Sequence, residues 1–241
     1  MDPVRGYLEG TEDLVVGVAR TASVADQIAA WIRDQIQFGH MKPGDAVRET
    51  PLAEHFGVSR GPVRDALKML DRERLIDLGG RSGAVVRTQS PDELLSIFRI
   101  RAEITALTMR IAAERERRNP RHLDAIRDGA AALVALAVDR DAPVSDYIRV
   151  RRRLSTVINL VVDSSYLSRL GLELELEIAL HWAAMMGKPR QHQSSRAWLR
   201  IADAIIERRG DDAEREGRAI VLESLTELLR PETGIVAAPQ A

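Results

Sequence analysis

Apolar residues recur every three or four positions along most of this chain, a spacing that predicts amphipathic helices rather than strands. The clearest run has apolar side chains at steps of four: Val24, Ile28, Ile32 and Ile36. Because Ser23 is a good N-cap and Gly39 a good helix stop, we expect a helix from Val24 to about Phe38.

Two shorter helices joined by a tight turn are predicted next. Thr50 is a suitable N-cap, and Pro51 fits the first helical position, where a missing N–H costs nothing. Gly57 ends this helix, since glycine accepts the left-handed cap conformation that side chains resist. Ser59 then caps a second helix, which we expect to run to about Arg72.

The second of these helices has two different faces. One face is apolar, with residues at three- and four-residue steps: Val63, Ala66, Leu67 and Leu70. Another is basic, because Arg60, Arg64 and Lys68 recur every four residues, and Gly61 leaves room for a partner to approach the backbone. A helix-turn-helix enters the DNA major groove with such a helix, although a solvated charged face would also explain the basic stripe alone.

A glycine-rich stretch with a β-prone run on each side follows this helix pair. The two runs are residues 75–78 and 84–87, and the tip between them is Gly79-Gly80-Arg81-Ser82-Gly83. This pattern predicts a β-hairpin, and a short strand at 46–48 precedes the helix pair. In a winged helix such a tip lies along a neighbouring groove, where Arg81 would contact DNA.

Residues 57–67 read Gly-Val-Ser-Arg-x-Pro-Val-Arg-x-Ala-Leu, which resembles the operator-reading helix of the GntR family of bacterial transcription factors. Pro43-Gly44-Asp45 and the stretch 81–86 fit the same family pattern. The resemblance implies a regulator, a repressor in our interpretation, that binds a double-stranded DNA operator. We expect these residues to contact the operator: Arg48, Ser59, Arg60, Gly61, Arg64, Lys68 and Arg81.

The remainder of the chain shows helical periodicity without a convincing strand. We expect helices at 92–117, 120–138, 145–162, 165–186, 194–209 and 211–229, with a polar loop at 187–193. Short loops between amphipathic helices predict an antiparallel bundle. The predicted fold is therefore mostly α. Residues 1–20 form an extended arm, 21–88 a winged helix-turn-helix, 91–230 an all-helical effector-binding and dimerisation domain, and 231–241 a flexible tail.

The amino-acid composition excludes several classes of function. The 241 residues suit two modest domains, and the formal net charge of −1 means that placement of charge, not its total, carries the DNA argument. The absence of cysteine excludes disulfides, thiolate catalysis and cysteine zinc sites. We see no apolar run long enough for a membrane helix and no signal-peptide pattern, so we expect a cytoplasmic protein without a membrane partner.

The second domain resembles the all-helical FCD-type domain of the fatty-acid-regulator-like branch, in which many members hold a divalent metal with one aspartate and three histidines. The family's Asn-x-Tyr-Leu turn resembles residues 164–167, Ser-Ser-Tyr-Leu. Counting from the family motifs puts these residues at the four ligand positions: Arg151, Ser155, Trp198 and either Leu222 or Glu223. Only Glu223 is a ligating type, and the five histidines do not cluster at ligand spacing. We therefore predict no metal and no cofactor.

The same positions suggest a site for an anionic, partly apolar effector, such as a carboxylate. Arg151 and Ser155 lie one helical turn apart and face the same way. Trp198 and Glu223 complete this predicted site, and Arg101 matches an arginine common in the family's first helix of this domain. One alternative stays open: arginines 149 and 151–153 are a solvated basic run, and Trp198 fills a closed core.

No nucleophile, base and orienting group combine in this sequence, so we do not expect an enzyme. The favoured hypothesis is an effector-responsive homodimeric regulator bound to a near-palindromic site. A DNA-binding dimer whose helical domain is only structural is the second. The third is a metal-dependent hydrolase that would use Asp146, Asp163 or Glu223.

Overall fold

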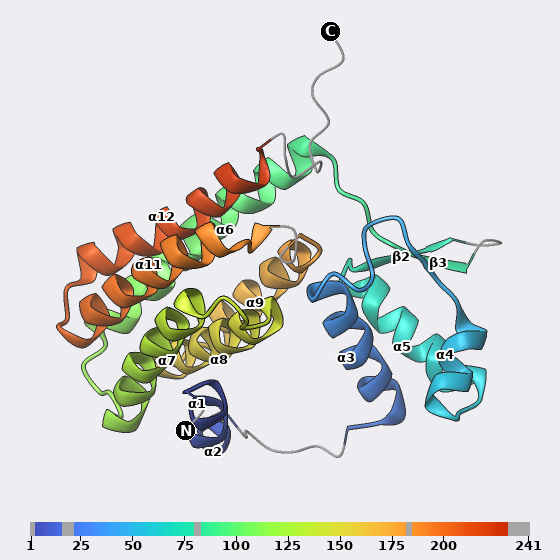
Figure 1. The fold of residues 1–241 in the computed structure, drawn as a ribbon, viewed down its shortest axis with the longest axis horizontal. Coiled ribbons are helices and arrows are strands. Elements are labelled where there is room, and N and C mark those ends of the chain that lie inside the picture. Colours follow the sequence, from blue (N-terminus) through green and yellow to red (C-terminus); the bar gives the residue numbers. More distant parts are fainter. Residues whose placement is uncertain (1–2, 16–21, 80–82, 182–184, 231–241) are drawn as a thin grey trace, which may run out of the picture.

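The computed structural model describes residues 3–15, 22–79, 83–181 and 185–230. The expected fold class is confirmed: a small winged helix-turn-helix domain lies beside a larger all-helical domain (Figure 1). None of the helices in these ranges has the length and apolar character needed to span a bilayer.

The described residues of the N-terminal winged domain form three helices and a small sheet. Its elements are α3 (Val24–Gln37), β1 (Ala46–Val47), α4 (Glu49–Phe56), α5 (Arg60–Arg72), β2 (Ile76–Gly79) and β3 (Gly83–Val86). The sheet is antiparallel in the order β1-β3-β2, with Ala46 opposite Val85 and Ile76 opposite Val86. The predicted hairpin is therefore present, and its tip, residues 80–82, lies outside the described residues.

The predicted caps explain most of these helix ends. Ser23 and Asp26 form a reciprocal capping box at the start of α3. Gly57 ends α4 with a φ of 64°, a conformation that favours glycine. Helix α4 differs from the prediction, because it begins at Glu49 with Arg48 as N-cap and not with Thr50 as the cap. The acidic side chain of Glu49 suits the first turn, where the helix dipole favours negative charge.

The core of the winged domain lies between α3, α5 and the sheet. Ile28, Ile32 and Ile36 of α3 are fully or almost fully buried, as their four-residue spacing predicts. The apolar stripe of α5 packs against them, and the strands add Val47, Ile76 and Val86. The opposite face of α5 is therefore left to solvent.

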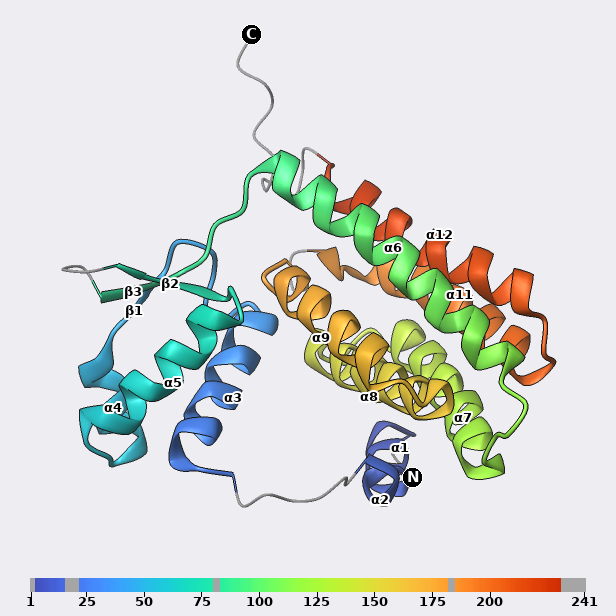
Figure 2. The ribbon, with the colours of Figure 1, turned by 180° about the vertical axis from the view of Figure 1, so that it is seen from behind.

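In its described residues, the helical domain contains six long helices. They are α6 (Pro91–Glu114), α7 (Pro120–Val138), α8 (Val144–Val162), α9 (Ser165–Ala179), α11 (Lys188–Ile206) and α12 (Gly210–Leu228). Helix α6 lies along α12, while α7 packs between α8 and α11 (Figure 2). Their shared core includes Phe98, Leu133, Leu154 and Ile201, so this domain has a hydrophobic core of its own.

The predicted polar loop at 187–193 is wrong for most of its length, because α11 already begins at Lys188. Gly187 is the N-cap and Pro189 occupies the first turn, a position where proline is tolerated. Arg190 and Gln191 are buried in this turn, and each side chain donates a hydrogen bond there. Their polarity therefore does not mark a surface loop.

The described residues of the N-terminal arm, 3–15, form two short helices rather than an extended segment. Helices α1 (Pro3–Gly10) and α2 (Glu12–Val15) lie against α7 and α8 of the helical domain. Val4 and Tyr7 are three residues apart and both are buried there. A Cβ at Gly129 would lie only 2.5 Å from the Tyr7 hydroxyl oxygen, so the glycine makes room for this ring. Burial of this short apolar stripe stabilises helices that would be too short alone.

Candidate functional site

The outer face of α5 presents the predicted basic stripe to solvent. Arg60, Arg64 and Lys68 are all exposed, while the apolar stripe of the same helix is buried. The Nε atom of Arg64 donates to Glu49 Oε1 of α4 at 2.9 Å, and Lys68 Nζ lies 3.1 Å from Asp65 Oδ1. These exposed pairs are weak in water and can be exchanged for phosphate or base contacts.

The other predicted operator-contacting residues lie near the ends of the same two helices. Ser59 is the N-cap of α5, although its side chain makes no cap hydrogen bond. A Cβ added at Gly61 would meet only the Ser59 Oγ atom, at 3.8 Å, so this glycine leaves open space at the surface. Arg48 is exposed at the N-cap of α4. Arg81 belongs to the wing tip that lies outside the described residues.

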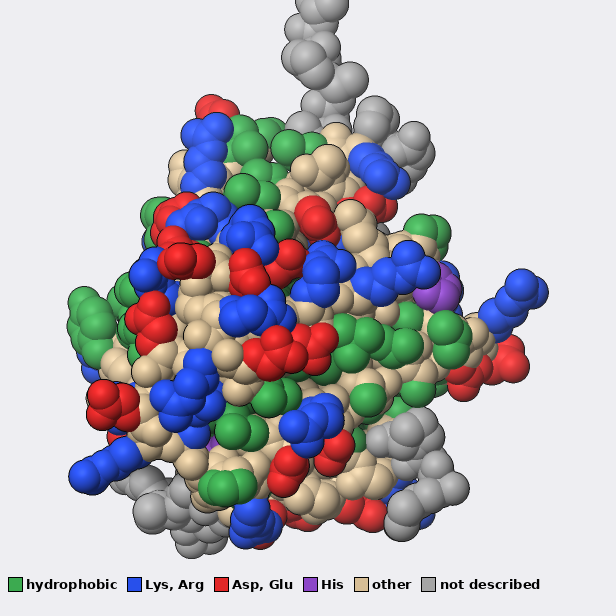
Figure 3. All heavy atoms as spheres, turned by 90° about the vertical axis from the view of Figure 1, so that its left-hand side faces the viewer, with side chains coloured by type: hydrophobic (Ala, Val, Ile, Leu, Met, Phe, Trp, Pro, Cys, Tyr) green, Lys and Arg blue, Asp and Glu red, His purple; other side chains and the backbone are tan. Residues whose placement is uncertain are grey.

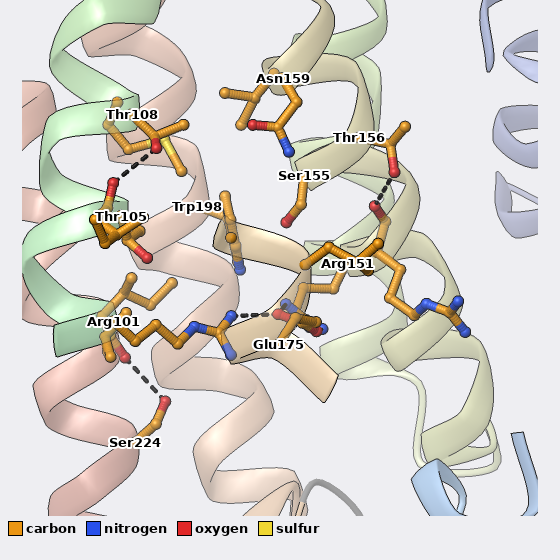
Figure 4. Close-up of a pocket in the computed structure, with 18 of the residues that line it drawn as sticks. Arg101, Thr105, Thr108, Arg151, Ser155, Thr156, Asn159, Glu175, Trp198 and Ser224 are labelled. Carbon is orange, nitrogen blue, oxygen red and sulfur yellow. Dashed lines mark hydrogen bonds and ion pairs between the residues drawn. The ribbon is translucent and has the colours of Figure 1, made fainter. Parts of the chain in front are cut away.

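A cavity of about 190 Å³ lies inside the helical domain and is lined by residues of α6, α8, α9, α11 and α12. Four of the residues predicted to bind an effector line it: Arg101, Arg151, Ser155 and Trp198 (Figure 4). This space remains although Trp198 lies in its wall, so the indole does not fill it. The fifth predicted residue, Glu223, does not line the cavity, whereas its neighbour Ser224 does.

Glu175 of α9 is a cavity residue that the sequence analysis did not identify. Its carboxylate accepts hydrogen bonds from the guanidinium groups of both Arg101 and Arg151, one of them from Arg151 Nη1 to Oε2 at 3.4 Å. The side chains of Arg151 and Glu175 are only 2% and 17% exposed. Burial alone would raise the pKa of the Glu175 carboxyl, but the two arginine charges outweigh it and lower the pKa to about 2.

The rest of the cavity wall combines hydroxyl groups with apolar surface. Its hydroxyl-bearing residues are Thr105, Thr108, Ser155, Thr156, Ser168, Ser194 and Ser224, and its apolar residues include Phe98, Met109 and Leu172. Trp198 is 5% exposed, and its buried Nε1 atom has no hydrogen-bond acceptor among the described residues. This nitrogen faces the space beside Arg101 and Glu175 (Figure 4). The site can therefore offer a donor to a ligand oxygen.

No group of three or more histidine, aspartate or glutamate side chains comes together as a metal site within the described ranges. Among the described residues that line the cavity, Glu175 is the one with a carboxylate, and its partners are arginines. The residues present therefore do not fit the ligand set of the metal-binding relatives, and the absence of a metal in this protein stays a prediction.

Residues 24–86 match the family model for bacterial regulatory proteins of the gntR family. These residues form a GntR-family winged helix-turn-helix domain. The transcriptional repressor GlaR of Escherichia coli K12 is 33% identical over 85 residues, which are 35% of this chain and 39% of that protein. The gluconate operon transcriptional repressor of Bacillus licheniformis is 39% identical over 80 residues, 33% of this chain and 32% of that protein.

The chain spans less than two fifths of the length of either of these relatives. A solved structure extends the comparison to both domains. Escherichia coli McbR/YncC superposes with a TM-score of 0.77 at 19% identity, covering 87% of this chain and 99% of that one. The likeness shows that the helical domain shares its fold with that protein, and it says nothing about a ligand.

A second polar group lies next to the cavity, around Arg190 of α11. Its Nη2 atom donates to Ile220 O at 2.9 Å and to Ser224 Oγ at 2.8 Å, and Nη1 lies 3.3 Å from Glu223 Oε2. The Arg190 side chain is 1% exposed, and burial lowers its pKa. Glu223 therefore serves as a partner of Arg190 at the rim, where its side chain is 33% exposed.

The end of α9 joins the helical domain to the GntR-family domain. Leu176 and Leu180 pack against the hydrophobic core of the winged domain. Glu177 Oε1 lies 2.7 Å from Arg74 Nε, and its other oxygen accepts from Gln89 Nε2 at 2.9 Å. Gln89, in the linker, also contacts the buried His181 ring at 2.9 Å. The two domains are thus connected by packing and by hydrogen bonds.

The face of the helical domain away from the GntR-family domain has a mixed charge. Lys and Arg side chains are interspersed there with Asp and Glu (Figure 3). The ion pairs between α6 and α12 are of this kind, such as Arg218 with Glu103 at 2.8 Å and Arg110 with Glu214 at 2.7 Å. Because opposite charges are mixed, the described residues of this face are suited to ion pairs with one another rather than to binding phosphate.

Proposed function

We propose that this protein is a DNA-binding transcriptional regulator, a repressor, whose operator binding is modulated by a small anionic effector. The observation that carries the DNA-binding part is the GntR-family domain with the basic face of its α5 helix exposed to solvent. Relatives named as repressors support the direction of regulation. The protein acts on double-stranded DNA in the cytoplasm and has no catalytic role.

On the operator, Arg60 and Arg64 reach base edges or adjacent phosphates, while Arg48 and Ser59 hold the DNA backbone. Lys68, Gly61 and the wing residue Arg81 extend the same contact surface. Phosphate contacts supply affinity and fix the position of the protein, whereas arginine contacts to guanine supply sequence preference.

Replacing Arg64 by alanine is expected to weaken binding to an operator selected from random DNA by ~1–3 kcal/mol, because a bidentate arginine contact to a base is lost. Fluorescence anisotropy at fixed salt measures this change. Arg64→Lys keeps the charge and should lose mainly sequence preference. Arg127→Ala, at an exposed arginine of the helical domain, is the matched control. Equal affinities of wild type and Arg64→Ala would contradict the assignment of α5.

The effector-binding part is supported by the cavity in the helical domain. Arg101 and Arg151 supply two positive charges, Ser155 a hydroxyl and Trp198 an indole N–H beside apolar surface. This chemistry suits a carboxylate with an apolar part. The domain is then an FCD-type domain of the fatty-acid-regulator branch that works without a metal. If a panel of carboxylates leaves the operator affinity of the wild type unchanged, effector control is contradicted.

A homodimer is the third part of the proposal. One helix-turn-helix reads only a few base pairs, and two-fold symmetric binding to paired half-sites supplies the missing specificity. Ile100 and Leu107, two turns apart on α6, are 57% and 44% exposed and offer apolar surface for a second copy. We expect sedimentation of the full chain at micromolar concentration to show a dimer, and a monomer would contradict this.

A further inference from the structure

Helix α9 carries a cavity residue and residues that contact the GntR-family domain within its last two turns. Glu175 binds the two cavity arginines, and the next two residues, Leu176 and Glu177, contact the winged domain. An α-helix transmits a displacement over such a short distance because its backbone hydrogen bonds hold successive turns together. A displacement of the Glu175 carboxylate is therefore transmitted directly to the contact between the domains.

The charges in the cavity favour the entry of an anion. Arg101 and Arg151 share one carboxylate, that of Glu175, so these three side chains together have an excess positive charge. Arg101 and Arg151 are also so well buried that water screens their charges little. A ligand carboxylate would seek the same guanidinium N–H groups that Glu175 now uses.

From these observations we propose that Glu175 is an internal competitor of the effector: it anchors α9 in the ligand-free protein, and an anionic effector acts by displacing it from Arg101 and Arg151. This inference rests on the proposed effector-controlled operator binding. Displacement frees the last turns of α9, which changes the contact of Leu176 and Glu177 with the winged domain and so lowers operator affinity. A neutral ligand of the same shape cannot displace the carboxylate and leaves operator affinity unchanged.

Two substitutions separate the two ends of this helix. Glu175→Gln removes the competing charge in the cavity, and Glu177→Gln weakens only the contact with Arg74 and Gln89. Glu103→Gln is the matched control, because Glu103 pairs with Arg218 in the same domain but contacts neither the cavity nor the winged domain. All variants are made in the full chain, and circular dichroism checks their folding.

The probe is benzoate, with benzamide as the neutral analogue at equal ionic strength. Thermal-shift titration should show Glu175→Gln binding benzoate at least about 5-fold more tightly than the wild type, with no response to benzamide. Without any ligand, operator affinity should fall by about 5- to 150-fold in Glu175→Gln, the range of typical allosteric coupling. Glu177→Gln should also lose operator affinity while binding benzoate as the wild type does, and Glu103→Gln should match the wild type in both measurements.

Unchanged operator affinity in Glu175→Gln, or benzoate binding no tighter than in the wild type, overturns the inference. If Glu175→Gln does not fold, Glu177→Gln decides alone, because unchanged operator affinity in that variant removes the proposed link between α9 and the winged domain. Failure of the proposed function looks different: the wild type selects no DNA sequence, or Arg64→Ala binds the selected operator as well as the wild type.

Discussion

Replacing Arg190 with alanine should lower the free energy of unfolding by about 2–5 kcal/mol, the range found when a large buried side chain is truncated. The side chain is 1% exposed, and its guanidinium satisfies the Ile220 carbonyl, the Ser224 hydroxyl and the Glu223 carboxylate. Alanine removes this donor from the Ser224 hydroxyl and the Glu223 carboxylate, leaves the Ile220 carbonyl only its bond from Ser224 Oγ among side-chain donors, and adds an empty volume beside the cavity. Urea unfolding followed by circular dichroism measures the loss.

The same helix provides a matched control. Arg200 also pairs with a glutamate of α12, Glu216 at 2.7 Å, but its side chain is 52% exposed. Exposed pairs contribute little, so Arg200→Ala should unfold close to the wild type. Arg190→Met, which keeps much of the volume but no donors, should fall between the two. If Arg190→Ala and Arg200→Ala lose equal stability, the buried polar cluster around Arg190 does not support this part of the fold.

The sequence predicted the winged domain well because its signals are local. A capping serine at residue 23, a glycine at residue 57 and four-residue apolar spacing each act within one or two helical turns. Such signals do not depend on the rest of the chain. The start of α4 was misplaced because Thr50 and Glu49 are both suitable in a first turn, and the choice depends on their surroundings.

Features that depend on distant partners were missed. The N-terminal arm reads as irregular because its helices are stabilised by α7 and α8, and Gly129 makes room for Tyr7 from more than 100 residues away in sequence. The first turn of α11 reads as a loop because Arg190 and Gln191 are polar, yet Arg190 finds its partners on α12 and Gln191 donates to the nearby Met186 carbonyl. Polarity alone does not distinguish a solvated residue from a buried one with satisfied hydrogen bonds.

The residues of the cavity could likewise be predicted from the sequence only in part. Helical spacing correctly placed Arg151 and Ser155 on one face, and both line the cavity. Glu175 could not be recognised, since it lies in an alternating run, Leu-Glu-Leu-Glu-Leu-Glu, whose glutamates look alike in sequence. The count from the family motifs left Leu222 or Glu223 for the last position, and neither lines the cavity; one residue on a helix turns a side chain by about 100°. In the structure Ser224 is the one that faces the cavity.

Acidification should destabilise the protein through His181, a second large effect. Burial lowers the pKa of this ring to about 4, against about 6.5 in an unfolded chain. Between these two values the unfolded chain binds the proton and the folded protein does not, so stability is full above pH 6.5 and falls as the pH drops towards 4. At pH 4.5 the loss should reach about 2–3 kcal/mol relative to pH 7.

Comparing variants separates the contribution of His181 to the pH dependence of stability from the contribution of the carboxylates. His181→Gln has no ring to protonate, so its unfolding free energy should fall less between pH 7 and pH 4.5 than that of the wild type. His192→Gln, at an exposed histidine eleven residues further along, should follow the wild type. Urea unfolding at each pH gives the three curves. Parallel curves for His181→Gln and the wild type would show that the ring is accessible to protons in the folded state, against its burial beside Gln89 and Leu180.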